Sequence, residues 1–194
     1  MARNREFNPK TVVDAALDLF WRKGYNACSM DDVVRKSGVA RYGVYQEFKD
    51  KDQLYYATLK EYIDNVRSKV IKPFIRDGED SDYETLAEHF DLIVQVLEEG
   101  VYCGCFAHQA AIERGRDDPQ VKQIVEQFFT EAEGVYRKTI QNGINKGQIR
   151  ELSVAELSTY VMGIQRALIA MSKQSRPIEE QKKYVRCALE LLKS

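Results

Sequence analysis

The chain has 194 residues, of which 44% are hydrophobic and 30% are charged, and its net charge is -1. This composition is typical of a globular protein and excludes a general polycation. Because no apolar run approaches the roughly 20 residues of a membrane span, and the N-terminus lacks the apolar core of a secretory signal, we expect a cytoplasmic protein without a membrane partner.

The first predicted helix begins at Pro9 and ends near Gly24. Asn8 before Pro9 is a typical N-cap followed by a first helical residue. The apolar residues within this segment recur at helical spacing, at Val13, Ala16, Leu17 and Phe20. We expect this face to pack on the following elements, with Trp21 and Tyr25 completing the same small core.

Two short helices joined by a glycine turn are predicted over residues 29–48. Ser29 and Asp32 have the spacing of a capping box, and Gly38 interrupts the helical pattern. A second helix that projects steeply from the first is the arrangement that fits a DNA major groove. Residues 1–50 carry nine Lys and Arg against seven Asp and Glu, so the helix-turn-helix pattern, rather than the charge, predicts nucleic-acid binding.

Helices continue through the rest of the chain. Asp50 and Gln53 repeat the capping pattern before a long helix that Pro73 is expected to end or kink. Caps and apolar periodicity predict further helices, at about residues 86–97, 104–115, 119–147, 154–171 and 177–192. Since no segment alternates apolar and polar residues as a strand does, we predict an all-α fold of about nine helices.

The last two helices carry more apolar surface than a thin helical body needs. This surface lies along Val154 to Met171 and along Val185 to Leu192. Pairing both helices with their symmetry copies forms a four-helix, twofold interface, so we expect a homodimer. The alternative is that these apolar residues form a core within one protomer.

With the helix-turn-helix placed, the chain resembles the tetracycline-repressor (TetR) family of bacterial one-component regulators. The matching residues are Gly24-Tyr25, Ser29-Met30-Asp31-Asp32-Val33, Ser37-Gly38-Val39-Ala40-Arg41, Tyr45, Phe48, Lys51 and Leu54. A looser match to one C-terminal subgroup comprises Gly104-Cys105-Phe106, Ala111, Glu113 and Asp118-Pro119-Gln120-Val121.

The resemblance implies a dimeric transcription regulator that binds a double-stranded DNA operator. Its three-helix DNA-binding head is expected at residues 6–66, with the helix-turn-helix at about 29–48. A helical domain for ligand binding and dimerisation is expected at residues 67–194. The expected function is that of a repressor released from its operator by an unidentified small-molecule inducer, which must prefer the released conformer by several kcal/mol.

The resemblance also implies the DNA-binding residues. Ser29, Tyr45 and Lys51 are expected to hold phosphates, because hydroxyl and ammonium groups bind backbone oxygens. The residues expected to approach base edges or the groove wall are Arg41, Tyr42 and Gly43.

Two further positions at the second helix of the motif stand out, Gln46 by its chemistry and Ala40 by its departure from the family pattern. The amide of Gln46 is suited to pair with adenine. Ala40 stands where a hydroxyl residue usually caps this helix, so a side-chain cap is expected to be missing or supplied by another residue, at a cost of about 1 kcal/mol.

A ligand pocket is expected among the helices that begin near residues 51, 86, 104 and 121. Its predicted wall residues are Tyr62, Phe90, Phe106, His108, Phe128 and Tyr160. The alternative for each of these side chains is a plain core position.

Cys103 and Cys105 suggest a redox or electrophile switch, because Cys105 precedes a predicted helix whose dipole favours the thiolate. This gives an alternative function, a thiol- or electrophile-sensing helical module that acts through a protein partner. The spacing of the two cysteines and His108 differs from that of structural zinc sites, so no metal is expected.

No cofactor and no enzymatic activity are expected. The sequence has neither a Gly-x-Ser-x-Gly nucleophile motif nor a phosphate-binding glycine loop. Glu98, Glu99 and Glu113 are interpreted as solvated carboxylates on helix surfaces.

Overall fold

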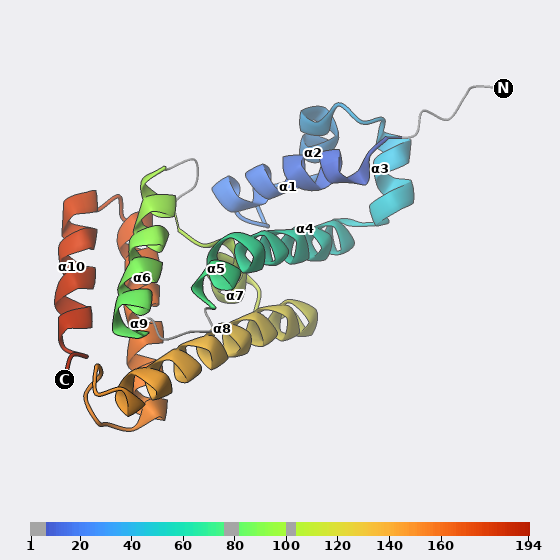
Figure 1. The fold of residues 1–194 in the computed structure, drawn as a ribbon. Coiled ribbons are helices and arrows are strands. Elements are labelled where there is room, and N and C mark those ends of the chain that lie inside the picture. Colours follow the sequence, from blue (N-terminus) through green and yellow to red (C-terminus); the bar gives the residue numbers. More distant parts are fainter. Residues whose placement is uncertain (1–6, 76–81, 100–103) are drawn as a thin grey trace. The chain divides into compact units, whose positions relative to one another are not determined.

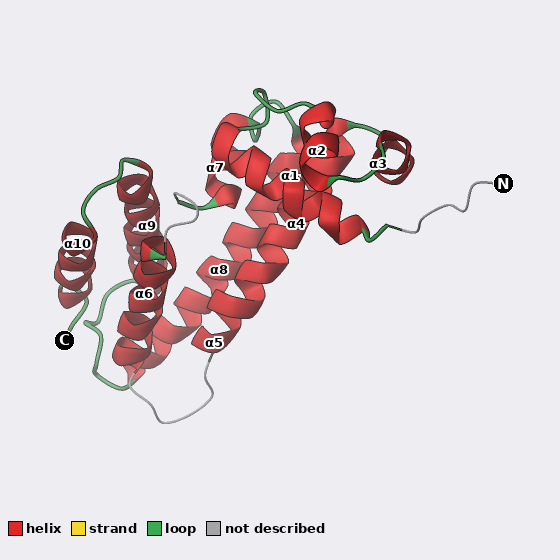
Figure 2. Cartoon of the chain, turned by 90° about the horizontal axis from the view of Figure 1, so that it is seen from above, coloured by secondary structure: helices red, strands yellow, loops and turns green. Residues whose placement is uncertain are grey.

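The computed structural model describes residues 7–75, 82–99 and 104–194, and every regular element in these ranges is helical (Figures 1 and 2). The only β-type pairing among them is an isolated bridge between Ile149 and Lys193. The elements are α1 (Pro9–Lys23), α2 (Met30–Ser37), α3 (Arg41–Phe48), α4 (Lys51–Val66), the π-helical turn η1 (Arg67–Ile71), α5 (Lys72–Phe74), α6 (Asp82–Glu98), α7 (Phe106–Glu113), α8 (Pro119–Asn145), α9 (Val154–Lys173) and α10 (Ile178–Glu190). Counting α4, η1 and α5 as one rod gives nine helices in the described part, which confirms the all-α prediction.

The chain forms two compact units. The first contains the residues up to Asn65 together with Phe106–Val125, and the second contains Val66–Cys105 and Glu126–Ser194. The first unit therefore includes α7 and the first turns of α8, which the predicted division by chain order assigns to the C-terminal domain. The remainder of α8 belongs to the second unit.

The first unit is built on α1. Asn8 caps this helix by accepting a hydrogen bond from the Lys10 N–H at 3.0 Å. Its apolar face is buried and packs against α2. Trp21 and Tyr25 join this core as predicted, since the Trp21 ring lies 4.9 Å from that of Tyr62 and the Tyr25 ring 5.1 Å from that of Tyr55.

Pro73 explains the irregular end of the α4 rod. Proline has no N–H, so the α-helical hydrogen bond to the carbonyl of Lys69 cannot form, and the proline ring crowds that carbonyl. Lys69 lies within η1, where the helix widens into a π turn before ending at Phe74. The predicted disturbance at Pro73 is confirmed.

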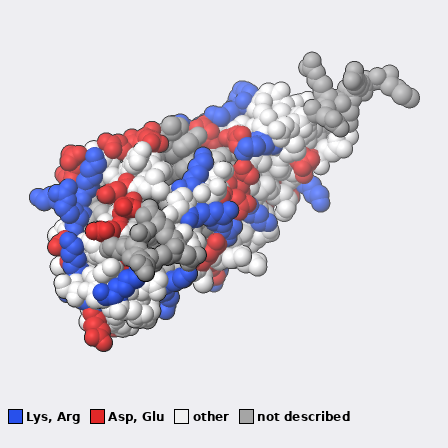
Figure 3. All heavy atoms as spheres, viewed as in Figure 1, with Lys and Arg blue, Asp and Glu red and all other residues white. Residues whose placement is uncertain are grey.

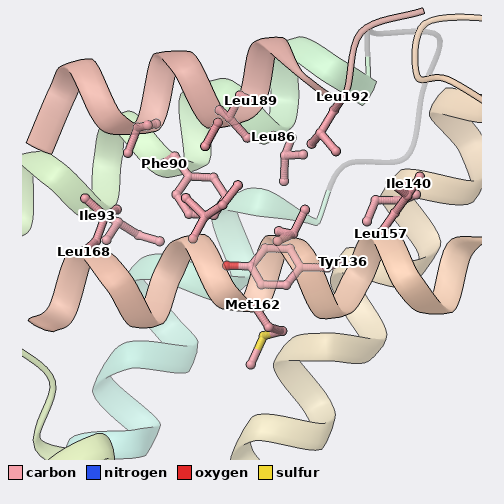
Figure 4. Close-up of a cluster of buried hydrophobic side chains, with 14 of the residues drawn as sticks. Leu86, Phe90, Ile93, Tyr136, Ile140, Leu157, Met162, Leu168, Leu189 and Leu192 are labelled. Atoms are coloured by element: carbon pink, nitrogen blue, oxygen red, sulfur yellow. The ribbon is translucent and has the colours of Figure 1, made fainter.

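The second unit has a single large apolar core among α6, the later turns of α8, α9 and α10 (Figure 4). Leu157, Val161, Ile164 and Leu168 of α9 all contribute to this core. The prediction that a symmetry copy covers these apolar residues of α9 is therefore wrong, because other helices of the same protomer bury them. Homodimerisation, if it involves α9, must use the opposite face of the helix.

Candidate nucleic-acid interface

The α2–turn–α3 segment has the local geometry expected of a helix-turn-helix. Ser29 Oγ accepts the Asp32 N–H at 3.1 Å, and the Asp32 carboxylate accepts the Ser29 N–H at 2.9 Å, so the capping box is complete. Gly38 adopts a left-handed conformation with φ 68° and ends α2 by donating its N–H to Val34 O. This conformation costs glycine little and other residues more.

One face of α3 is anchored and the other is free. Val44 and Phe48 are buried in the first unit, whereas Arg41, Gln46 and Glu47 are exposed. Tyr42 is 72% exposed, which is high for a large aromatic side chain. The structure therefore presents α3 outward, as a helix that enters a DNA groove must be presented.

Arg41 has partners on both helices of the motif. Its guanidinium forms an ion pair with Asp31 of α2 and donates to Tyr45 Oη at 3.3 Å. The guanidinium carbon also lies 5.0 Å from the centre of the Tyr45 ring. Both members of the ion pair are more than half exposed, so solvent screens it and its contribution to stability is small. Asp31 was absent from the predicted site residues.

Packing inside the protein explains why position 43 is a glycine. A Cβ atom at this position would lie 3.0 Å from Cε1 of Phe7, a tighter contact than side chains normally make. The missing side chain thus makes room for the Phe7 ring on α3. At the start of the same helix, Ala40 occupies the N-cap position without a side-chain hydrogen bond, as expected.

The residues expected to bind phosphate differ in their solvent exposure and in their contacts within the protein. Ser29 is exposed, but its hydroxyl also donates to Asp32 at 2.7 Å. Lys51 is half-buried, with Nζ 3.9 Å from the centre of the Tyr25 ring, and burial lowers the pKa of this ammonium group. Figure 3 shows basic and acidic side chains intermixed on the face in view, which agrees with the near-neutral net charge.

A second group of contacts ties α7 to the loop after α1. The Glu113 carboxylate accepts the backbone N–H groups of Tyr25 at 3.0 Å and of Asn26 at 3.3 Å. The prediction that Glu113 is solvated is wrong, because its carboxylate binds these two N–H groups. Both groups lie just beyond the end of α1 and have no partner within that helix. Gly24 has φ 82°, and a Cβ atom there would lie 2.9 Å from Glu113 Oε1.

Arg114 is the centre of this network. Its guanidinium binds Asp52 at 2.7 Å and Asp118 at 2.8 Å, and its Cζ lies 3.8 Å from the centre of the Tyr25 ring. Tyr56 Oη donates to Asp118 at 2.9 Å. We call these five side chains, Tyr25, Asp52, Tyr56, Arg114 and Asp118, the Arg114 network.

The tyrosines of the Arg114 network are held protonated. Burial and the hydrogen bond to Asp52, 2.5 Å long, together raise the pKa of Tyr25 to about 12. Burial and the hydrogen bond to Asp118 likewise raise the pKa of Tyr56 to about 12. Near neutral pH both hydroxyls therefore act as donors to carboxylates. Sequence reasoning missed the network, although Asp118 belongs to the looser family signature.

The predicted pocket residues are divided between the two units. Tyr62, Phe106 and His108 belong to the first unit, where the rings of Tyr62 and Phe106 lie 5.7 Å apart. Phe90 is part of the core of the second unit. Tyr160 is 37% exposed and donates its hydroxyl to Ala188 O at 3.0 Å.

Phe128, by contrast, lines a small apolar cavity in the second unit. The other residues around it are Val66, Val70, Ile71, Phe74, His89, Ala132, Val135, Tyr136 and Gln165.

Cys105 directly precedes α7, as predicted, and is half-buried, whereas Cys103 lies outside the described residues. Within the described ranges, no three His, Cys, Asp or Glu side chains gather closely enough to hold a metal ion. None of the described helices combines the length and the apolar character needed to span a bilayer.

Comparisons with known proteins match both parts of the chain. Residues 12–58 match the model of bacterial regulatory proteins of the tetR family, and residues 83–187 match that of the tetracyclin repressor-like C-terminal domain. The HTH-type transcriptional regulator YezE of Bacillus subtilis is 22% identical over 99% of this chain and 100% of its own. The HTH-type transcriptional repressor ComR of Escherichia coli is 32% identical over 54% of this chain and 50% of its own.

Among solved structures, a cysteine mutant of the TetR family regulator CifR, complexed with a 26-bp double-stranded operator DNA, superimposes with a TM-score of 0.79. The superposition covers 97% of this chain and 98% of the CifR chain at 22% identity, which shows a shared fold. The two family models together span more than half of the sequence and fall on the helix-turn-helix and on the helical body. The chain therefore belongs to the tetR family of bacterial regulatory proteins.

Proposed function

We propose that this protein is a cytoplasmic, homodimeric repressor that binds an operator through α3 and leaves it when a small molecule binds the second unit. The observation that carries the proposal is the exposed face of α3, which lies beside a complete capping box and a left-handed glycine turn. Two similar proteins support the same function, because ComR is a transcriptional repressor and the CifR mutant is complexed with operator DNA.

Base contacts are assigned to the exposed side chains of α3. Arg41 is suited to bind guanine through two hydrogen bonds, and Gln46 is suited to bind adenine. On binding, the Arg41 guanidinium exchanges Asp31 for a base edge, a low-cost exchange because the ion pair is solvent-exposed. Tyr42 offers an aromatic surface for a thymine methyl group or the groove wall, and the Gly43 backbone is assigned to the groove wall beside it.

Phosphate contacts are assigned to Ser29, Tyr45 and Lys51. Ser29 stands at the N-terminus of α2, where free N–H groups and the helix dipole favour an anion. Lys51 starts α4 in the same way, and its ammonium has only to leave the Tyr25 ring to reach a phosphate.

Dimerisation follows from the operator geometry. Two copies of α3 must meet successive major grooves about 34 Å apart. The outer face of α9 is suited to a twofold contact, because a Cβ atom at Gly163 would meet no other atom within 4 Å and Ala170 is exposed. Leu191, just after α10, is a further exposed apolar side chain, at 57%.

The Arg114 network is proposed to connect ligand binding with DNA binding. It joins the end of α7 and the start of α8 to the loop after α1 and to α4. A shift of α7 would therefore act directly on the helices that support α3. The helix α8 itself continues into the second unit, where the small apolar cavity lies.

The test is selection of genomic DNA fragments by the purified protein, followed by footprinting and measurement of operator affinity. Arg41→Ala should weaken operator binding by about 1–3 kcal/mol and relax specificity at one base pair. Arg186→Ala on α10 removes the same charge far along the chain from α3 and serves as the matched control. Equal affinities of wild type and Arg41→Ala, or a binding constant insensitive to salt, would contradict the proposal.

A further inference from the structure

The apolar cavity of the second unit is where α6, α8, α9 and the η1–α5 segment meet. Its free volume is about 20 Å³, which is room for roughly one water molecule. Phe74, Phe128 and Tyr136 supply aromatic walls, and the remaining lining is mostly aliphatic. A larger hollow of about 450 Å³ lies between α6 and α10, but charged side chains such as Asp91, Glu98 and Lys182 line it.

Two of the residues that line the small cavity carry buried polar atoms without a hydrogen-bond partner among the described residues. His89 is only 6% exposed, and its Nδ1 atom has no hydrogen-bond partner among the described residues. The buried Oε1 atom of Gln165 likewise has no hydrogen-bond partner among the described residues. Each buried unpaired polar group costs about 1–3 kcal/mol, so their presence in one cavity requires an explanation.

His89 is held in a defined position. Its Nε2 atom lies 2.9 Å from the hydroxyl of Tyr136, and its ring centre lies 4.3 Å from that of Phe74. Burial lowers the pKa of His89 to about 4, so the imidazole is neutral near pH 7. A neutral imidazole has one donor and one acceptor nitrogen, and the contact with Tyr136 uses one of them.

Charge excludes one class of ligand. None of the described residues that line the cavity is Lys, Arg, Asp or Glu. An ionised carboxylate or ammonium in this place would lose its hydration without gaining a counter-charge. An uncharged molecule with one polar group, by contrast, satisfies the unpaired atoms and fills the apolar remainder.

One wall of the cavity is suited to move. Val70 and Ile71 of η1 line it, together with Val66 at the end of α4. A π turn holds an extra residue relative to the α-helix, and such turns occur frequently at functional sites. Rearrangement of this turn beside Pro73 gives the cavity a route to enlarge around a ligand.

We propose that this cavity is the effector site and that it selects a small, uncharged, largely apolar molecule, of the size of a phenol, whose single polar group pairs with His89 and Gln165. This assignment rests on the proposed function only in calling the ligand an effector. The binding site and the ligand class are properties of the free protein.

Binding is tested with three probes of similar size by titration calorimetry of the full-length protein without DNA. The probes are p-cresol, which has a hydroxyl, toluene, which has none, and benzoate, which is charged. We expect p-cresol to bind most tightly and benzoate to bind at least about tenfold more weakly. Benzoate binding as tight as p-cresol, or no measurable binding of p-cresol, would overturn the proposal.

Two variants locate the site. Gln165→Leu replaces the amide by an apolar side chain of roughly similar size and so removes the acceptor. It should weaken p-cresol binding by about tenfold and leave toluene binding unchanged. Ala132→Leu fills the cavity and should weaken both neutral probes. Gln95→Leu on the exposed side of α6 is the matched control, and circular dichroism checks folding. Unchanged p-cresol binding in both cavity variants would place the site elsewhere.

Operator release is measured separately. If p-cresol binds in the cavity but leaves operator affinity unchanged, the proposed binding site is supported. The proposal that this class of ligand is the effector is then overturned. If the protein binds no operator at all, the proposed function fails while the calorimetric result still decides the site.

Discussion

The Arg114 network of the first unit and the small cavity of the second unit differ in how their buried polar groups are paired. In the first unit, Arg114 pairs with Asp52 and Asp118, and Tyr25 and Tyr56 donate to the same two carboxylates. In the second unit, a large apolar core surrounds a cavity in which polar atoms of His89 and Gln165 are unpaired.

The difference corresponds to two mechanical roles. A satisfied polar network has few alternative arrangements and holds the DNA-binding helices in place. An apolar cavity with unpaired atoms and a π turn in its wall is open to a ligand that completes it. The comparison predicts that the two units respond differently to mutation and to pH.

The largest effect is expected when the Arg114 network loses its centre. Arg114→Met leaves Asp118, which is 7% exposed, without its main counter-charge, and should lower the free energy of unfolding by about 3 kcal/mol. Urea unfolding followed by circular dichroism measures it. Arg137→Met is the control, because its pair with Glu133 on α8 is exposed and should contribute less than about 1 kcal/mol. Equal losses in the two variants would show that the network does not stabilise the first unit.

The second unit should be the more acid-sensitive one because of His89. Burial lowers its pKa from 6.5 to about 4, so its neutral form favours the folded state. This contribution is complete above pH 6.5 and is lost as the pH falls towards 4, which amounts to about 2 kcal/mol between pH 7 and pH 5. The measurement is the unfolding free energy at both pH values for wild type and His89→Asn. An unchanged pH dependence in the variant would mean that another group is responsible.

Substitutions of two glycines, one in each unit, should change stability in opposite directions. Gly24→Ala forces a side chain into a left-handed position 2.9 Å from Glu113 Oε1 and should destabilise by about 1–2 kcal/mol. Gly134→Ala in α8 meets no atom within 4 Å and should stabilise by about 0.5–1 kcal/mol. Thermal unfolding distinguishes the two signs, and a stabilised Gly24→Ala variant would contradict the described contact.

A small effect is expected at the start of α3. Ala40→Ser supplies the missing side-chain cap and should stabilise the protein by about 1 kcal/mol without weakening operator binding. Chemical denaturation and operator affinity are the two measurements. A stable variant with weakened DNA binding would instead assign Ala40 a direct place in the interface.

Sequence patterns predicted the features that depend on neighbouring residues. Ser29 and Asp32 are three residues apart, and Gly38 and Pro73 act on the turn that contains them, so the helix-turn-helix and the disturbed end of the α4 rod were both foreseeable. The same is true of the cap at Asn8. Each of these effects operates within about one helical turn.

The partnerships that give the candidate sites their chemistry depend on long-range packing. Glu113 and Tyr25 are 88 residues apart, and so no local pattern separates this carboxylate from a solvated one. The sequence of α9 shows the same apolar face whether a second subunit or α6 and α10 bury that face. Only the fold distinguished these two possibilities. His89 and Gln165 came together for the same reason, since helical periodicity determines which face a residue occupies but not which helix packs against it.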